Sequence, residues 1–146
     1  TRARGKNEAE DRELEAELLA SEKEMAEHYM LVDLGRNDLG RVAATGSVEH
    51  GPIAQVTYYG QVMHLSTEIS ARIKEGLDCF AAAQSCFPAG TVSGAPKIRA
   101  MELLAEIETE KRGIYSGMVG YFDTRGNMDS AIAIRSALIK DGTVHV

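Results

Sequence analysis

Residues 87–97, FPAGTVSGAPK, constrain the fold of this chain more than any other stretch. Its two prolines and two glycines exclude regular structure before Gly94. Pro96 suits the first turn of a helix, because that turn leaves its N–H groups without intrahelical partners. Apolar residues then recur at helical spacing as far as Ile107. We therefore predict a tight loop that leads into a helix running from Pro96 to about Thr109.

This junction of loop and helix has two interpretations. A helix N-terminus carries partial positive charge and attracts anions, and Thr91, Ser93 and Lys97 would add hydroxyls and a full charge. Alternatively, it is an ordinary helix start whose small residues allow close packing. The spacing is not that of a Walker loop, because no Gly-Lys-Ser/Thr follows four residues after a glycine. An anion site and a structural helix start both remain open.

The charge of the chain is concentrated in one segment. Residues 8–27 hold nine acidic and two basic residues, which gives this segment a net charge of −7. Because the whole chain has a net charge of −6, the remaining residues sum to +1. No basic, aromatic-rich surface remains for nucleic acid, and no apolar run approaches the ~20 residues of a membrane helix. Cys79 and Cys86 have neither redox nor zinc spacing, which favours a reducing compartment: the cytoplasm, or a plastid if the source is a plant.

Capping patterns predict two helices near the start of the chain. Asn7 with Glu10 marks a helix over residues 8–20, and Ser21 with Glu24 marks a longer one over residues 22–42. Glycines at 35 and 40 would allow a break or an early end in the second helix. Alternating patterns predict strands at 47–49, 54–59 and 61–69, and a short helix follows at 76–85.

The last third is predicted to form hairpins. Strands at 114–122 and 128–139 flank a three-residue loop, in which Gly126 would take the left-handed conformation. Asp141-Gly142 predicts a second turn, leading into residues 143–146. The order of helices and strands favours an α+β sandwich of sheet and helices over repeated βαβ units.

In the first hairpin, paired residue numbers would sum to 250, so Tyr115 would lie directly across from Arg135. The residues beside them on that face are glycine and alanine, whereas a solvated face normally carries several polar side chains. This leaves room for a ligand with a carboxylate, which arginine binds bidentately. A structural salt bridge involving Arg135 is the alternative.

Two further groups of residues could carry chemistry. Glu24, Glu27 and His28 share a face of the second helix, and carboxylates there suit Mg²⁺. The alternative is that the helix dipole favours acidic residues in the first turns without any ligand. His64 lies on a strand between the small residues Val62 and Ser66, which leaves room for a ligand, although a lone strand histidine is more often structural.

Longer motifs resemble the catalytic region of the chorismate-utilising enzymes. They are EMAEH at 24–28, VDLGRNDLGR at 32–41, FPAGTVSGAPK at 87–97, YSG at 115–117 and AIR at 133–135, and the match covers essentially the whole chain. The chain is most similar to the anthranilate synthase component I branch. The aminodeoxychorismate branch favours GGSITG at 89–94, and the isochorismate and salicylate branches diverge more around 32–41.

The resemblance implies a three-layer α/β/α sandwich with orthogonally packed antiparallel sheets, of which residues 1–146 form part of the catalytic domain. It implies a Mg²⁺-dependent lyase that converts chorismate and ammonia into anthranilate and pyruvate in tryptophan biosynthesis. The ammonia would come from glutamine through a separate glutamine amidotransferase subunit, in a hetero-oligomer. The implied site comprises Glu27 and Glu24 at Mg²⁺, the catalytic His64, and the substrate-binding Thr1, Thr91, Tyr115 and Arg135.

The family's site also includes parts outside this chain. Its general-acid glutamate would lie upstream of Thr1, and its glycine-rich loop and second glutamate pair downstream of Val146. We therefore expect residues 1–146 alone to make no anthranilate. A catalytically incomplete binding module, or a phosphate-binding module at residues 91–97, is the non-enzyme alternative. The intact Glu27, His64 and Arg135 favour the enzyme.

Overall fold

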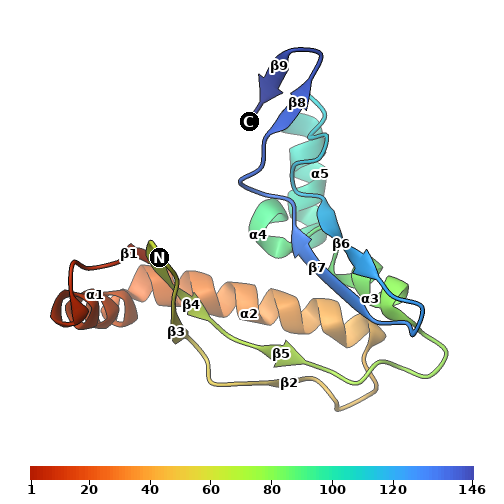
Figure 1. The fold of residues 1–146 in the computed structure, drawn as a ribbon. Coiled ribbons are helices and arrows are strands. Elements are labelled where there is room, and N and C mark those ends of the chain that lie inside the picture. The colour runs from red at the N-terminus through yellow and green to blue at the C-terminus, as the bar shows by residue number, and fades with distance from the viewer. The chain divides into compact units, whose positions relative to one another are not determined.

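The computed structural model describes residues 1–146 and divides into two compact units, Thr1–Arg72 and Ile73–Val146. Each unit combines helices with antiparallel strands, which confirms the predicted α+β class (Figure 1). None of the helices combines the length and the apolar character that a membrane span requires.

The two helices of the first unit, α1 (Glu8–Ala20) and α2 (Glu22–Val42), have the predicted bounds. The Asn7 side chain accepts hydrogen bonds from the backbone N–H groups of Ala9 and Glu10, and the Ser21 hydroxyl accepts one from Glu24. These bonds satisfy donors that a helix start otherwise leaves unpaired. Helix α2 continues through both of its glycines, so neither breaks it.

The strands of the first unit form two small antiparallel sheets. Strand β4 (Val62–Ser66) lies between β1 (Arg2–Ala3) and β3 (Gln55–Tyr58), while β2 (Glu49–His50) pairs with β5 (Ile69–Ser70). The segment 61–69, predicted as one strand, is therefore divided between two sheets. Leu18 of α1 and Met63 of β4 are the largest fully buried side chains.

A hydrogen-bonded tether joins α2 to the end of β4. His28 Nε2 lies 2.7 Å from Thr67 Oγ1, and the same hydroxyl accepts a 3.0 Å hydrogen bond from the backbone N–H of Ala54. Ala54 is buried, so this N–H depends on Thr67 for a partner. The tether thus fixes the first turns of α2 against the strand that carries His64.

The second unit contains three helices, α3 (Cys79–Cys86), α4 (Gly90–Ser93) and α5 (Lys97–Ile107). The prediction that no regular structure precedes Gly94 was wrong, because α4 forms one helical turn there. Helix α3 begins three residues later than predicted, since Asp78 caps it by accepting a hydrogen bond from Ala81 N. Helix α5 starts at Lys97, with Pro96 as its N-cap.

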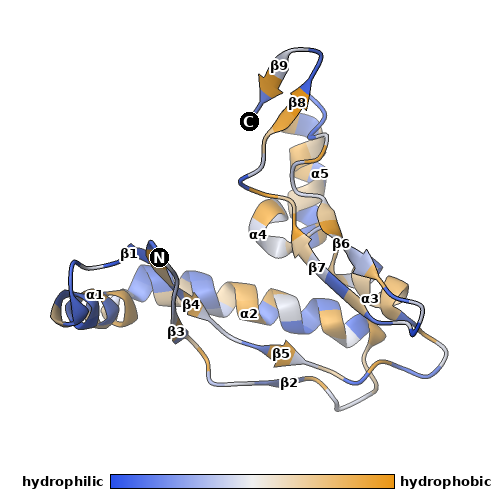
Figure 2. Cartoon of the chain, viewed as in Figure 1, coloured by the Kyte–Doolittle hydropathy of each residue, from blue (hydrophilic) through white to orange (hydrophobic).

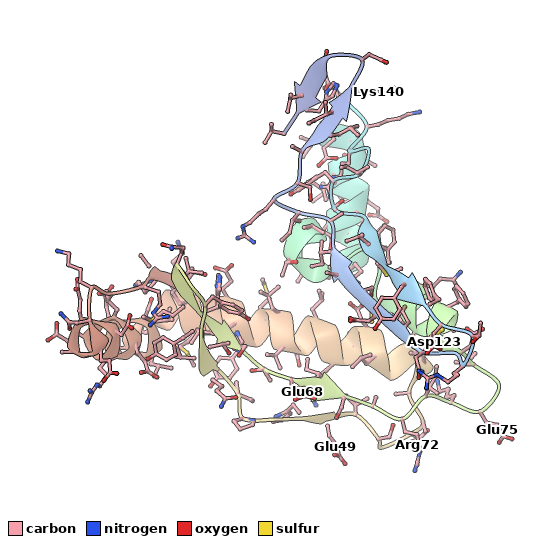
Figure 3. The ribbon with its side chains drawn as sticks, in the orientation of Figure 1. Glu49, Glu68, Arg72, Glu75, Asp123 and Lys140 are labelled. Carbon is pink, nitrogen blue, oxygen red and sulfur yellow. The ribbon has the colours of Figure 1, made fainter.

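Strands β6 (Met118–Phe122) and β7 (Met128–Ile132) form the first hairpin, and the predicted register is confirmed. Gly126 has φ +85°, as the turn requires, and the Asp123 carboxylate accepts hydrogen bonds from the N–H groups of Arg125 and Asn127 (Figure 3). At Gly120 the strands approach so closely that a Cβ would lie 2.7 Å from Ser130 Cα.

Strands β8 (Leu138–Lys140) and β9 (Thr143–His145) form the second hairpin. Asp141 and Gly142 have φ of 50° and 75°, which is the pattern of a type I′ turn and confirms the Asp-Gly prediction. The predicted strand over 128–139 is interrupted between β7 and β8. Ile139 and Val144 remain largely exposed on this apolar hairpin (Figure 2).

The ion pair of Asp11 yields a first prediction. Asp11 is only 6% exposed, and Arg4, followed by the Gly5 N–H, lowers the pKa of its carboxyl below the ordinary value of 3.8. The pair therefore stabilises the fold above about pH 4, and this contribution is lost as the pH falls through the lowered pKa. Asp11→Asn in the full-length protein should have a lower thermal midpoint than wild type at pH 7. The difference between the two midpoints should become smaller as the pH is lowered to 2.5.

The exposed residue Glu13, on the same helix, provides the matched control variant Glu13→Gln. A difference between Asp11→Asn and wild type that stays constant from pH 7 to pH 2.5 would contradict this linkage.

The His28–Thr67 tether yields a second prediction. Thr67→Val keeps the shape of the side chain but removes the hydroxyl, leaving the buried Ala54 N–H unpaired. We expect it to lower the free energy of unfolding by about 1–3 kcal/mol, measured by urea denaturation. Thr67→Ser keeps the hydroxyl and should be closer to wild type. Equal stability of the two variants would count against the tether.

Candidate functional site

The first unit brings together three residues of the predicted site: Thr1, Glu24 and His64. Strand β1 pairs with β4 so that Arg2 faces Met63 and Ala3 faces Val62. Continuing this register places Thr1 beside His64, where Thr1 Oγ1 lies 2.5 Å from His64 Nδ1. The amino nitrogen of Thr1 also donates to Glu24 Oε2 at 2.9 Å. Thr1, which precedes β1, therefore contacts both His64 within β4 and Glu24 on α2.

The Glu24 carboxylate is held on both of its oxygens. Thr1 donates to Oε2, and Arg2 Nη1 donates to Oε1 at 3.2 Å. Hydrogen bonds from the Thr1 nitrogen and from Arg2 lower the pKa of Glu24. Glu24 is therefore a carboxylate at neutral pH, held by contacts with both residues.

Glu27 and His28 follow Glu24 on α2, as predicted, but their surroundings differ. The Glu27 side chain is exposed, one turn along from Glu24. His28 instead bonds Thr67, and burial lowers the pKa of its ring. Across residues 1–146, no group of three or more histidine, cysteine, aspartate and glutamate side chains is placed to hold a metal ion.

In the second unit, the prediction that Tyr115 and Arg135 are cross-strand neighbours was wrong. The pairing ends at Gly117 and Ala133, where Ala133 N donates to Gly117 O at 2.8 Å. Beyond that point Ser116 and Arg135 have φ of 61° and 50°, so both chains leave the extended conformation. Non-glycine residues rarely take such angles, which is why the sequence pattern did not indicate the break.

Tyr115 and Arg135 nevertheless line one concavity. It has a volume of about 580 Å³, and Ile134, Leu138 and Arg112 are also among its walls. The two residues reach it from two turns, not from facing strands. A phenol and a guanidinium beside apolar walls can receive a small molecule that carries a carboxylate.

The loop before α5 supports the structural interpretation of that junction. Lys97 is 6% exposed, and its ammonium donates to the carbonyl of Cys86 at 3.2 Å. The Ser93 hydroxyl donates to the carbonyl of Ala89. Both side chains therefore bind backbone carbonyls. Of the three residues predicted to contact an anion, Thr91 on α4 is the one whose side chain is exposed.

Arg112 is a residue for which sequence reasoning assigned no role. Its guanidinium binds the Glu108 carboxylate, the carbonyl of Val92 and the Ser116 hydroxyl. It also lies 5.5 Å from the centre of the Tyr115 ring, within the range of a cation–π contact. Glu108 and Arg112 are four residues apart, which is the spacing of an ion pair on a helix. Helix α5 ends at Ile107, however, so neither residue lies on it.

Comparison with known proteins identifies relatives of this chain. A family model described as chorismate binding enzyme matches residues 1–146. Anthranilate synthase component 1 of Pseudomonas putida is 54% identical over all 146 residues. The structure of anthranilate synthase component I from Streptococcus pneumoniae superposes with a TM-score of 0.88 at 45% identity, over 98% of this chain.

A more distant structure is that of a protein named as a 2,3-dihydroxybenzoate-specific isochorismate synthase, from Bacillus anthracis. It has a TM-score of 0.80 at 27% identity, over 98% of this chain. The chain spans 30% of the length of the Pseudomonas relative, and 34% and 38% of the two structures. Because the family model covers the whole chain, residues 1–146 belong to the family of chorismate-binding enzymes.

Proposed function

We propose that the protein containing this chain is an anthranilate synthase large subunit, which converts chorismate and ammonia into anthranilate and pyruvate. The observation that carries the proposal is the meeting of Thr1, Glu24 and His64, three residues that the family resemblance assigns to the site. Identity of 54% to an anthranilate synthase component 1, against 27% to the isochorismate synthase structure, supports this branch of the family.

We propose that the carboxylates of α2 contribute to a Mg²⁺ site that other ligands complete. Magnesium is commonly held by one or two carboxylates, with waters and substrate oxygens completing its shell. Glu27 offers an exposed carboxylate, whereas the Glu24 carboxylate is already contacted by Arg2. Glu27 would therefore be the direct ligand, and Glu24 a direct or water-mediated one. When bound, the ion would supply positive charge to the ring carboxylate of chorismate.

His64 has a fixed orientation in this site. Thr1 Oγ1 contacts its Nδ1, and the edge of the ring meets Tyr59, with ring centroids 5.7 Å apart and planes at 71°. A side chain that contacts a reacting ring or moves a proton must be held at a defined angle and distance. We assign His64 to the substrate ring, near the carbon at which the hydroxyl leaves or ammonia adds.

In the second unit, the family resemblance assigns Tyr115, Arg135 and Thr91 to substrate binding. Tyr115 and Arg135 share one concavity, where the guanidinium would bind the enolpyruvyl carboxylate and the phenol would donate a hydrogen bond to it. The exposed Thr91 would add a hydroxyl. Thr1 would lie beside the ring carboxylate. A charge held by such fixed donors needs no reorganisation as the bond breaks.

The partner follows from the reaction. The reaction needs ammonia as a nucleophile, so we propose that a glutamine amidotransferase subunit supplies it, in a cytoplasmic hetero-oligomer that serves tryptophan synthesis.

The direct test uses the full-length protein with chorismate, an ammonium salt and Mg²⁺. We expect anthranilate, followed by its fluorescence, and an equal amount of pyruvate. Isochorismate without release of pyruvate would instead assign the protein to the isochorismate branch. Aminodeoxychorismate without pyruvate would assign it to the aminodeoxychorismate branch.

The metal assignment yields a third prediction. Glu27→Gln removes a charged ligand, so we expect activity at a fixed Mg²⁺ concentration to fall by more than about tenfold, with higher Mg²⁺ needed for half-maximal rate. Glu22→Gln, on the exposed first turn of the same helix, is the matched control. An unchanged dependence on Mg²⁺ in Glu27→Gln would refute the assignment.

A further inference from the structure

Arg112 connects three segments of the second unit that are separate in sequence. Its Nε and Nη2 bind the Glu108 carboxylate, with Nη2 at 2.6 Å from Oε1. Its Nη1 donates to the carbonyl of Val92 at 2.8 Å and to the Ser116 hydroxyl at 3.1 Å. One guanidinium thus joins the end of α5, the short helix α4 and the turn before β6.

Two of these bonds are made next to residues proposed to bind substrate. Val92 follows Thr91 on α4, and Ser116 follows Tyr115 in the turn. The Tyr115 ring itself lies 5.5 Å from the guanidinium carbon, and Tyr115 N donates to the carbonyl of Arg112 at 3.0 Å. Arg112 therefore contacts Tyr115 and is bonded to the residue that follows Thr91.

The turn that Arg112 holds is a strained one. Ser116 has φ of 61° without being a glycine, and it is only 6% exposed. Such a conformation persists when surrounding contacts fix it from several directions. Here Ser116 N donates to the carbonyl of Ala133, while its hydroxyl accepts from Arg112. Without the guanidinium, one of these two restraints is lost.

The charge of Arg112 is used within the protein. Glu108 raises the pKa of Arg112, and Arg112 lowers that of Glu108, so both stay ionised as a pair. All three guanidinium nitrogens contact protein atoms. A lysine would keep the charge, but it could not bind Glu108 in a fork and reach Val92 and Ser116 as well.

We propose that Arg112, paired with Glu108, is a positioning residue that holds Thr91 and Tyr115 in the arrangement that binds chorismate. The proposal rests on the function proposed above. Arg112 also lines the concavity of Tyr115 and Arg135, but its three guanidinium nitrogens bind protein atoms, so the role proposed for it is to hold its neighbours. We expect that loss of the guanidinium fork weakens substrate binding and leaves the Mg²⁺ dependence set by α2 unchanged.

The test compares Arg112→Lys with wild type in the full-length protein. We expect the KM for chorismate to rise by about ten- to hundredfold, because misplacing binding groups by an ångström has effects of this size. The Mg²⁺ concentration for half-maximal rate should not change. Arg99→Lys, in an exposed ion pair with Glu102 on α5, is the matched control and should leave both values as in wild type.

Hydrogen exchange supplies a readout that does not depend on activity. Arg112→Lys should lose protection in residues 89–94 and 114–117 together, and Arg99→Lys in neither. If Arg112→Lys fails to fold, Glu108→Gln, which weakens the same fork, is measured in its place. A lowered thermal midpoint with wild-type KM and wild-type protection would overturn the proposal, since Arg112 would then be only structural.

The two proposals fail in different ways. If wild-type protein makes no anthranilate, the proposed function is wrong, while the exchange data still decide whether Arg112 holds the two segments. If wild-type protein is active and Arg112→Lys binds chorismate normally, the positioning role is wrong.

Discussion

The ion pair between Arg4 and Asp11 holds the first strand of the first unit's sheet against helix α1. Arg4 follows β1 and binds a buried carboxylate on α1, and its Nη1 donates to the carbonyl of Tyr59. These bonds fix β1 along β4. The pairing in turn brings Thr1 to His64, so the geometry of the proposed site depends on a contact that includes none of its residues. Loss of Arg4 would be costly, because it would leave the buried Asp11 carboxylate without its charged partner.

The second unit also contains an arginine that binds both a carboxylate and a backbone carbonyl. Arg112 binds Glu108 at the end of α5, and its remaining donors hold backbone and hydroxyl groups beside Thr91 and Tyr115. Arg4 and Arg112 each bind one carboxylate and also donate a hydrogen bond to a backbone carbonyl. This use suits arginine, whose planar group presents several donors in fixed directions. Each unit can therefore hold its proposed binding residues by itself.

Local chemistry made α1, α2 and the first hairpin predictable. Asn7 and Ser21 mark helix starts through bonds to neighbouring residues, and Gly126 sets the register of β6 and β7. The positions of Tyr115 and Arg135 were not predictable, because positive φ at Ser116 and Arg135 leaves no mark in a pattern of alternating residues. The inward direction of Lys97 and the role of Arg112 depend on distant partners. The roles of Glu27, His64 and Thr91 in catalysis stay predictions.

The close approach of the two strands at Gly120 has a consequence for how relatives of this chain can change. A Cβ at residue 120 would lie 2.7 Å from the backbone of Ser130, which no rotation of a side chain could relieve. Selection for the hairpin alone would keep glycine there, even in a descendant that had lost the proposed activity. A glycine kept at residue 120 would therefore indicate only that the fold is retained. Changes at a proposed site residue such as His64 would indicate loss of the proposed reaction.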